Sequence, residues 1–272
     1  MLAFGGVLVN IGVMKKLLVM LLALGWVIGG RAELHTKAVE YRDGDTLLEG
    51  YSAYDDSIIK GKRPGVLIVH QWMGLTDNEK MRAEMLAKLG YSVFAVDVYG
   101  KGVRPKDTKE AGTLATKYKN DRELLRRRVK AGLQVLVQNE MTDTKKVAAI
   151  GYCFGGTAVI ELARSGADVA GVVSFHGGLD SPKPEDGKNI KCKVLALHGA
   201  DDPNVTAKDL AAFEEEMRKA KVDWQLIKYG GAVHAFTQKE AGNDNSKGAA
   251  YNELADKRSW EALQQFFAEI FR

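Results

Sequence analysis

Short apolar runs recur along the chain from about residue 60 onward, and amphipathic stretches separate them. Runs such as Val66–His70 lack the alternation of apolar and polar residues that is typical of a strand with one solvent-exposed face. They predict strands that are covered on both faces. The stretches between them repeat apolar residues at helical spacing, as at Leu210, Phe213 and Met217. Strands that alternate with helices predict an α/β fold with a mostly parallel central sheet and helices on both faces.

The predicted strands cover residues 66–70, 92–98, 147–152, 169–175, 194–198 and 224–229. The first predicted helix starts at the capping box Thr76–Glu79. The others cover residues 107–139, with a break near Asn120, and residues 155–164, 206–220 and 249–271. In the first helix, Met81, Met85 and Leu89 are spaced to form one apolar face. An Asp43-Gly44 turn within residues 37–57 predicts an antiparallel hairpin before the alternation begins. No repeat or linker interrupts residues 33–272, which predicts a single domain.

The first 32 residues have the pattern of a secretory signal peptide. Lys15 and Lys16 precede an uncharged, mostly apolar run, and Gly30-Arg31-Ala32 ends it with small residues at the positions that signal peptidase inspects. The run is shorter than the roughly 20 apolar residues of a membrane-spanning helix, although an uncleaved anchor is the alternative. We therefore expect a periplasmic or secreted protein that starts at Glu33 and is not attached to the membrane, with Met14 as an alternative translation start.

Composition and charge exclude several classes of protein. The chain is 46% hydrophobic and 27% charged, as in ordinary globular proteins. Its net charge of +4 falls to +1 once Lys15, Lys16 and Arg31 of the leader are left out, so a nucleic-acid partner is not expected. Two cysteines cannot build a disulfide framework or a tetrahedral zinc site of cysteines, and we expect no metal and no cofactor.

The segment Gly151–Gly156 follows a predicted strand and opens a predicted helix. It matches the G-x-nucleophile-x-G pattern, with Cys153 in place of the usual serine. Glycines are needed because side chains beside so tight a turn would collide, and the helix N-terminus behind Cys153 favours its thiolate. The alternative is a buried structural cysteine beside a glycine-rich turn.

Two further groups follow strand ends in the order nucleophile, acid, base that this architecture uses. Asp201 and Asp202 follow the strand that ends at His198, and either carboxylate could hold the Nδ1–H of a histidine. His234 lies in the loop after the last predicted strand. Taken alone, each aspartate is more typical of a turn or helix cap, and a loop histidine is usually only solvated.

These three segments together resemble the dienelactone hydrolase family, and the resemblance extends from Lys62 to the C-terminus. It implies an α/β-hydrolase fold with a Cys-His-Asp triad and no metal or cofactor. Cys153 would be the nucleophile, His234 the base and Asp202, rather than Asp201, the acid. The resemblance places the oxyanion hole on the backbone N–H groups of Trp72 and Phe154.

The sequence departs from that family at three positions near the implied site. Gln71 stands where family members have a glutamate that contacts the nucleophile. Lys101 and Gln238 stand where the dienelactone-cleaving members have two arginines that hold the substrate carboxylate. One positive charge is kept and one is lost, which argues against a strongly acidic substrate.

The resulting hypothesis is an enzyme that hydrolyses small esters or lactones through an acyl-cysteine intermediate. The alternatives are a catalytically impaired member that acts as a binding protein, and a thiol-based redox protein. A redox protein would need a resolving cysteine, but Cys192 is expected to be buried at the opposite end of the sheet from Cys153. His70, His176 and His198 end strands and are expected to hydrogen-bond to nearby loops.

The leader gives the first testable prediction. N-terminal sequencing of protein recovered from an exporting host should give Glu33 as the first residue, because Ala32 completes the cleavage pattern. Soluble cytoplasmic protein that still begins at Met14 would contradict it.

Overall fold

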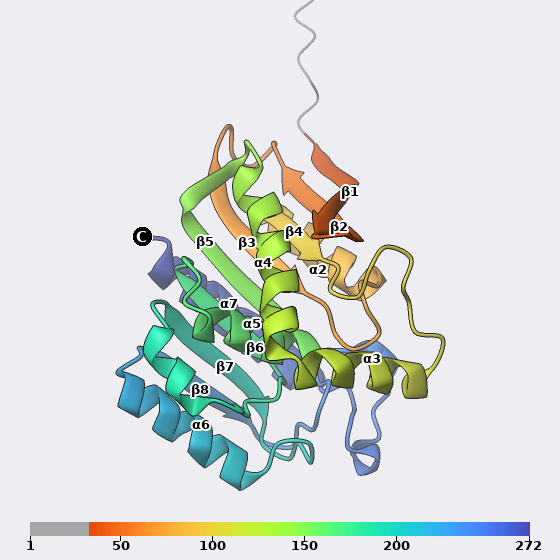
Figure 1. Ribbon diagram of the computed structural model, residues 1–272, viewed down its shortest axis with the longest axis vertical. Helices are drawn as coiled ribbons and strands as arrows, with labels where there is room; N and C mark the ends of the chain where they lie inside the picture. Colours follow the sequence, from red (N-terminus) through yellow and green to blue (C-terminus); the bar gives the residue numbers. More distant parts are fainter. Residues whose placement is uncertain (1–32) are drawn as a thin grey trace, which may run out of the picture. The chain divides into compact units, whose positions relative to one another are not determined.

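An eight-stranded sheet runs through residues 33–272, the part of the chain that the computed structural model describes (Figure 1). Its strand order is β1-β2-β4-β3-β5-β6-β7-β8. The strands from β4 to β8 in this order are parallel, whereas β2 is antiparallel to both β1 and β4. The α/β-hydrolase fold and its N-terminal hairpin are therefore confirmed. The predicted signal peptide, residues 1–32, lies outside the described residues.

The elements follow the predicted order closely. The strands are β1 (Leu34–Asp43), β2 (Thr46–Asp55), β3 (Arg63–Val69), β4 (Ser92–Val96), β5 (Thr142–Tyr152), β6 (Gly171–Phe175), β7 (Lys193–Gly199) and β8 (Trp224–Tyr229). The α-helices are α2 (Asp77–Ala87), α3 (Thr108–Asn120), α4 (Arg122–Gln138), α5 (Phe154–Arg164), α6 (Ala207–Ala220) and α7 (Glu253–Ile270). Short 3-10 turns cover Pro184–Asn189, Lys239–Ala241 and Asn245–Lys247.

The central strands are buried on both faces because helices cover both. In β3, Leu67 and Val69 belong to one core with residues of α4, α5 and α6, whereas Val66 and Ile68 belong to a second core with α2 and α7. Successive side chains of a strand point to opposite faces, so an unbroken apolar run fills both cores. The predicted helix break is also confirmed, since Asp121 ends α3 and caps α4 by accepting from the Leu124 N–H.

The inward face of α2 differs from the predicted one. Met81 and Leu89 are 46% and 45% exposed, whereas Leu86 is fully buried. Arg82 is also buried, and its guanidinium donates to Asp256 of α7 at 2.8 Å. The inward side of α2 thus includes a buried ion pair with a neighbouring helix, which the helical spacing of apolar residues does not predict.

The last helix begins later than predicted, at Glu253 instead of residue 249. Asn252 caps it by accepting from the Ala255 N–H at 3.0 Å. The residues before the cap pair with another loop, because Ala249 forms a bridge with His234. These residues therefore support the candidate site.

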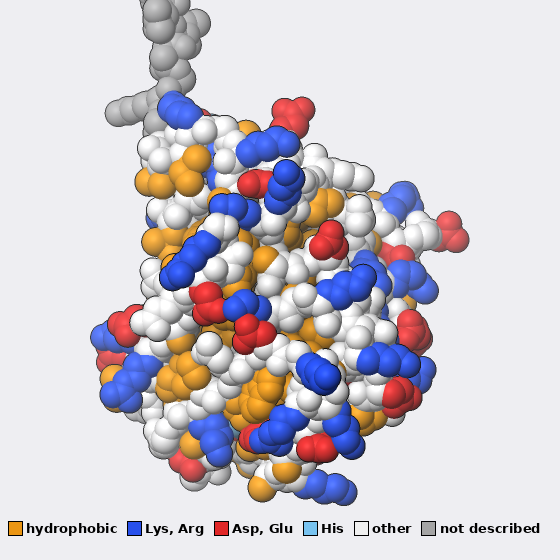
Figure 2. Space-filling model, turned by 90° about the vertical axis from the view of Figure 1, so that its left-hand side faces the viewer, with side chains coloured by type: hydrophobic (Ala, Val, Ile, Leu, Met, Phe, Trp, Pro, Cys, Tyr) orange, Lys and Arg blue, Asp and Glu red, His pale blue; other side chains and the backbone are white. Residues whose placement is uncertain are grey.

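Charges of both signs are interspersed on the face shown in Figure 2, and no area of one sign covers it. This agrees with the nearly balanced charge of residues 33–272. No helix in this part of the chain combines the length and apolar character of a membrane span.

A buried ion network ties α4, α5 and α6 together. Arg164 of α5 is fully buried and donates to Glu161 at 2.9 Å and to Glu216 of α6 at 2.6 Å. Arg126 of α4 donates to the second oxygen of Glu161 and to Asp186. Each carboxylate in this network compensates a charge that has lost its water, so removal of one partner is costly.

This network predicts a large difference between two neighbouring residues of α6. Glu216→Ala should lower the free energy of unfolding by about 3–5 kcal/mol, because the buried Arg164 guanidinium loses the carboxylate that accepts two of its hydrogen bonds and keeps only Glu161, which Arg126 shares. Glu215 is the control, since its pair with Lys219 is exposed and Glu215→Ala should change the free energy by less than about 1 kcal/mol. Urea denaturation measures both, and equal midpoints would contradict the prediction.

Candidate active site

Cys153 occupies a sharp turn between β5 and α5. Its φ of 53° and ψ of −114° lie outside the helical and extended regions. A Cβ on Gly151 would lie 2.0 Å from the Gly155 carbonyl oxygen, and one on Gly155 would lie 2.1 Å from that of Val69. These positions exclude any side chain, which is the steric reason for the glycine pattern around Cys153.

The turn brings Cys153 together with His234 and Asp202. The Cys153 Sγ and His234 Nε2 atoms are 2.9 Å apart, and His234 Nδ1 lies 2.8 Å from Asp202 Oδ2. Asp202 is buried and also accepts from the Asn204 N–H at 2.8 Å. Asp201 accepts instead from the Gly231 N–H at an exposed site, so it fixes the start of the His234 loop and does not contact the imidazole.

The charges in this group stabilise one another. Burial raises the pKa of the Cys153 thiol, but the neighbouring His234 imidazolium more than offsets this, and the pKa lies below its ordinary value. Burial lowers the pKa of His234, but the Cys153 thiolate and the hydrogen bond to Asp202 raise it to about 10. For Asp202, burial raises the pKa and the hydrogen bond with His234 lowers it, with a net decrease. The favoured state is a thiolate beside an imidazolium, which is the arrangement of an activated nucleophile.

Two backbone N–H groups are candidates for an oxyanion hole. Phe154 is the first residue of α5, where an N–H has no partner within the helix, and Trp72 lies in the loop after β3. Within residues 33–272, neither N–H donates a backbone hydrogen bond. The Tyr99 hydroxyl donates to the Trp72 carbonyl at 2.9 Å and thereby anchors the residue on the C-terminal side of that N–H. The Phe154 N–H also hydrogen-bonds the Cys153 sulfur and helps to lower the pKa of that thiol. N–H groups in these positions can stabilise an oxyanion.

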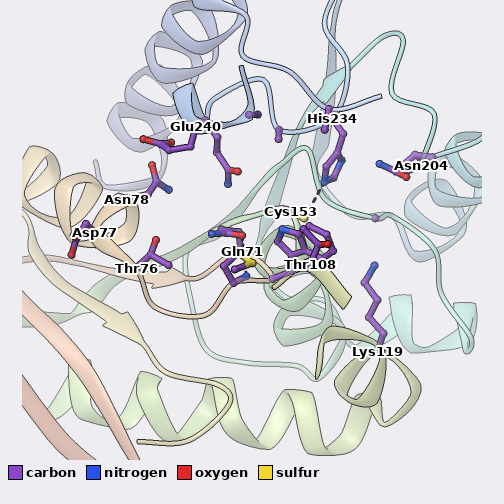
Figure 3. Close-up of a pocket in the computed structure, with 18 of the residues that line it drawn as sticks. Gln71, Thr76, Asp77, Asn78, Thr108, Lys119, Cys153, Asn204, His234 and Glu240 are labelled. Carbon is purple, nitrogen blue, oxygen red and sulfur yellow. Dashed lines mark hydrogen bonds between the residues drawn. The ribbon is translucent and has the colours of Figure 1, made fainter. Parts of the chain in front are cut away.

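Cys153 and His234 open onto a cavity of about 1060 Å³ (Figure 3). The charged and amide side chains around it lie on two sides of the sulfur. Lys119 and Asn204 are on one side, and Asp77, Asn78 and Glu240 are on the other. The apolar side chains of Trp72, Met73, Val205 and Ala235 complete much of the lining. A cavity of this size admits a small organic substrate.

Of the three residues predicted to lie near the substrate, two line the cavity and one does not. Gln71 and Gln238 both line the cavity. The Gln71 side chain accepts from the Met73 N–H at 3.0 Å, and the buried Gln238 Nε2 has no partner among the described residues. Lys101 does not line the cavity, because its ammonium pairs with Glu40 and Glu49 of the hairpin.

Lys119 is the ammonium group that the cavity lining contains, and no pattern in the sequence marked it as a site residue. It lies in the last turn of α3, points toward Cys153 in Figure 3 and helps to lower the pKa of that thiol. In the sequence it is one lysine of a polar helix face, a pattern usually typical of solvated residues.

Cys192 lies apart from Cys153, His234 and Asp202, whereas His70 hydrogen-bonds the backbone near them. Cys192 directly precedes β7, at the end of the sheet away from Cys153, and burial raises its pKa to about 12. The His70 Nδ1 atom donates to the Gln71 carbonyl, and its Nε2 accepts from the Val98 N–H. Within residues 33–272, no three His, Cys, Asp or Glu side chains are arranged to ligate a metal.

Comparison with known proteins agrees with this geometry. Residues 48–271 match the profile of the dienelactone hydrolase family. A solved dienelactone hydrolase-like promiscuous phosphotriesterase from metagenomic libraries is 39% identical, with a TM-score of 0.82, and the match covers 88% of this chain and 99% of that one. A second structure, m3DLH, is 38% identical with a TM-score of 0.84, covering 87% of this chain and 98% of the other.

A relative from Aquifex aeolicus that carries the name carboxymethylenebutenolidase is 26% identical over 233 residues. That match covers 84% of this chain and 96% of the relative. The resemblance inferred from the three sequence segments is thus confirmed at the level of the family.

The ion pair predicts how Cys153 reacts with pH. Alkylation by iodoacetamide should remain fast well below pH 8.5, about the pKa of a free cysteine, because the thiolate persists down to the lowered pKa. His234→Ala should move the profile to higher pH. Burial would still raise the pKa of the Cys153 thiol, and the main charge that lowers it would be gone. Cys192 is the internal control and should stay unmodified in the folded protein. A wild-type profile like that of a free thiol would show that the pair does not form.

Proposed function

The chain belongs to the dienelactone hydrolase family of lactone and ester hydrolases, and we propose that it cleaves small esters or lactones through an acyl-cysteine intermediate. The observation that carries the proposal is the chain of contacts between three groups, of which Cys153 and His234 line the cavity. Cys153 Sγ, His234 and Asp202 are linked by contacts of 2.9 and 2.8 Å. This is the sequence of nucleophile, base and orienting acid that covalent hydrolysis requires.

In the first half of the reaction, the Cys153 thiolate attacks the carbonyl carbon of the ester. The carbonyl oxygen becomes an oxyanion, which the N–H groups of Trp72 and Phe154 stabilise. The oxyanion then re-forms the carbonyl, the carbon–oxygen bond of the ester breaks, and the His234 imidazolium protonates the departing alkoxide. The products are an alcohol, or the free hydroxyl end of an opened lactone, and a thioester on Cys153.

In the second half, His234 is neutral and can act as a base. It takes a proton from water as the water attacks the thioester carbonyl, and collapse of the second oxyanion releases the carboxylic acid and the thiolate. Asp202 stabilises the imidazolium in both halves and holds the ring so that Nε2 faces the sulfur. The Gln71 amide cannot act as a base near neutral pH, so we assign the proton transfers to His234.

We also propose that the protein acts outside the cytoplasm, in the periplasm or the medium. The support is the basic, apolar and small-residue pattern of residues 1–32, which N-terminal sequencing tests.

An activated ester such as p-nitrophenyl acetate tests the chemistry. The wild type should release p-nitrophenol with continued turnover, and mass spectrometry after rapid acid quenching should find one acetyl group on Cys153. Asp202→Asn should lower kcat on the order of 10⁴-fold, because the imidazole loses its orienting carboxylate.

Asp201→Asn is the matched control, since that carboxylate is exposed and bonds only the Gly231 N–H. It should leave kcat close to the wild-type value. Equal losses in the two folded variants would refute the assignment of Asp202, and acetylation without turnover would favour a binding protein over an enzyme.

A further inference from the structure

His176 is a buried imidazole directly after β6, outside the three groups that the mechanism uses. Its side chain is fully buried, and its φ of 40° places the backbone in the left-handed region. A non-glycine residue in that region is uncommon, so the backbone conformation there must be stabilised by the surrounding contacts. The contacts of the ring indicate what holds it.

One ring nitrogen of His176 contacts the nucleophile's own backbone. The Cys153 N–H lies 3.1 Å from His176 Nδ1 and 2.9 Å from the Phe175 carbonyl oxygen. A backbone N–H can only donate, so Nδ1 must be the unprotonated nitrogen. The end of β6 thus fixes the peptide at which the chain turns into α5.

The other ring nitrogen contacts the loop that carries the base. His176 Nε2 lies 2.8 Å from the Thr237 hydroxyl oxygen, three residues beyond His234. Since Nδ1 is the acceptor, Nε2 carries the hydrogen and donates it. The Thr237 carbonyl in turn accepts from Arg82 at 3.1 Å, and Arg82 pairs with Asp256. Contacts therefore continue from the nucleophile turn through β6 and the His234 loop to α2 and α7.

The His176 ring also packs against the base. The rings of His176 and His234 meet edge to face, with their centroids 5.4 Å apart. The titratable and charged groups around His176 are Cys153, His234, His198, Arg82 and Tyr152. Burial, followed by the positive charge of His234, holds the pKa of His176 well below its ordinary value, so His176 stays neutral beside the imidazolium.

We propose that His176 is a positioning residue that clamps the nucleophile turn to the base loop and thereby sets the separation of Cys153 Sγ and His234 Nε2. The 2.9 Å contact between those atoms joins segments that follow different strands, β5 and β8. His176 contacts both segments through one rigid ring. The effect on ester hydrolysis rests on the proposed function, whereas the effect on the thiolate can be measured without it.

The variants His176→Asn and His176→Leu separate the clamp from simple packing. Asn and Leu have similar shapes, but only the Asn side chain offers an oxygen where Nδ1 accepts from the Cys153 N–H. Asn also tolerates the left-handed backbone. In His176→Leu, the pH profile of Cys153 alkylation should move to higher pH, and kcat should fall on the order of 10²-fold with KM little changed. His176→Asn should recover only the part of both effects that comes from the Cys153 N–H contact, because its shorter side chain ends before the position from which Nε2 reaches the Thr237 hydroxyl.

Thr237 provides a second test that leaves the strained backbone of His176 untouched. Thr237→Val removes the hydroxyl at nearly constant shape. It should also move the pH profile of Cys153 alkylation to higher pH, because His176 Nε2 loses its hydrogen-bond partner. Thr237→Ser keeps the hydroxyl and should stay close to wild type. His198→Leu controls for the loss of a buried imidazole at the neighbouring strand end and should leave the profile in place.

Two results would overturn the proposal. One is an unchanged alkylation profile in both His176→Leu and Thr237→Val. The other is an equal shift in the Asn and Leu variants together with no difference between Thr237→Val and Thr237→Ser. If His176→Leu does not fold, as judged by its circular dichroism, the Thr237 pair decides alone. A wild-type protein that cleaves no ester would refute the proposed function but would leave the alkylation results to judge His176.

Discussion

The chain changes from strand to helix around a single residue, Cys153, and the other parts of the site are arranged to meet it. The turn is possible only where the backbone of Gly151, Gly155 and the end of β3 approach to distances that no side chain allows. It raises the sulfur above the sheet edge and places the first N–H of α5 beside it. His234 and Asp202 come from loops after β8 and β7, so the parallel sheet determines that all three groups meet at one edge.

Three buried or half-buried histidines near this edge show how partners decide the state of one side chain. His70 and His176 each pair one nitrogen with a donor and the other with an acceptor, and burial lowers the pKa of both. His234 has a thiolate on one side and a carboxylate on the other, and its pKa is raised. Of these three histidines, His234 is the one that carries a charge, and the two neutral rings hold backbone groups in fixed places.

Much of the fold followed from sequence because its signals are local. Apolar runs, caps such as Asp121 and the glycines around Cys153 each depend on a few neighbouring residues. The elements that differed depend on contacts between distant segments. Arg82 lies on the inward side of α2 and pairs with Asp256 of α7, and Ala249, which precedes α7, pairs with His234. The positive charge at the cavity also depends on contacts between distant segments: Lys101 pairs with the hairpin, whereas Lys119 of α3 lines the cavity.

The two cysteines of the chain lie too far apart to protect each other. Leu197 is level with Phe175 and Tyr152 in the sheet, and Cys192 lies five residues before Leu197, which is about 17 Å along an extended strand. A disulfide needs Cα atoms within about 7 Å, so no bond between the two can shield the nucleophile. An oxidant that reaches Cys153 would give a sulfenic acid or a disulfide with a thiol of another molecule, and the chain holds no thiol that reverses either product. In an oxidising medium, recovery of the reduced Cys153 therefore depends on thiols of other molecules in that medium.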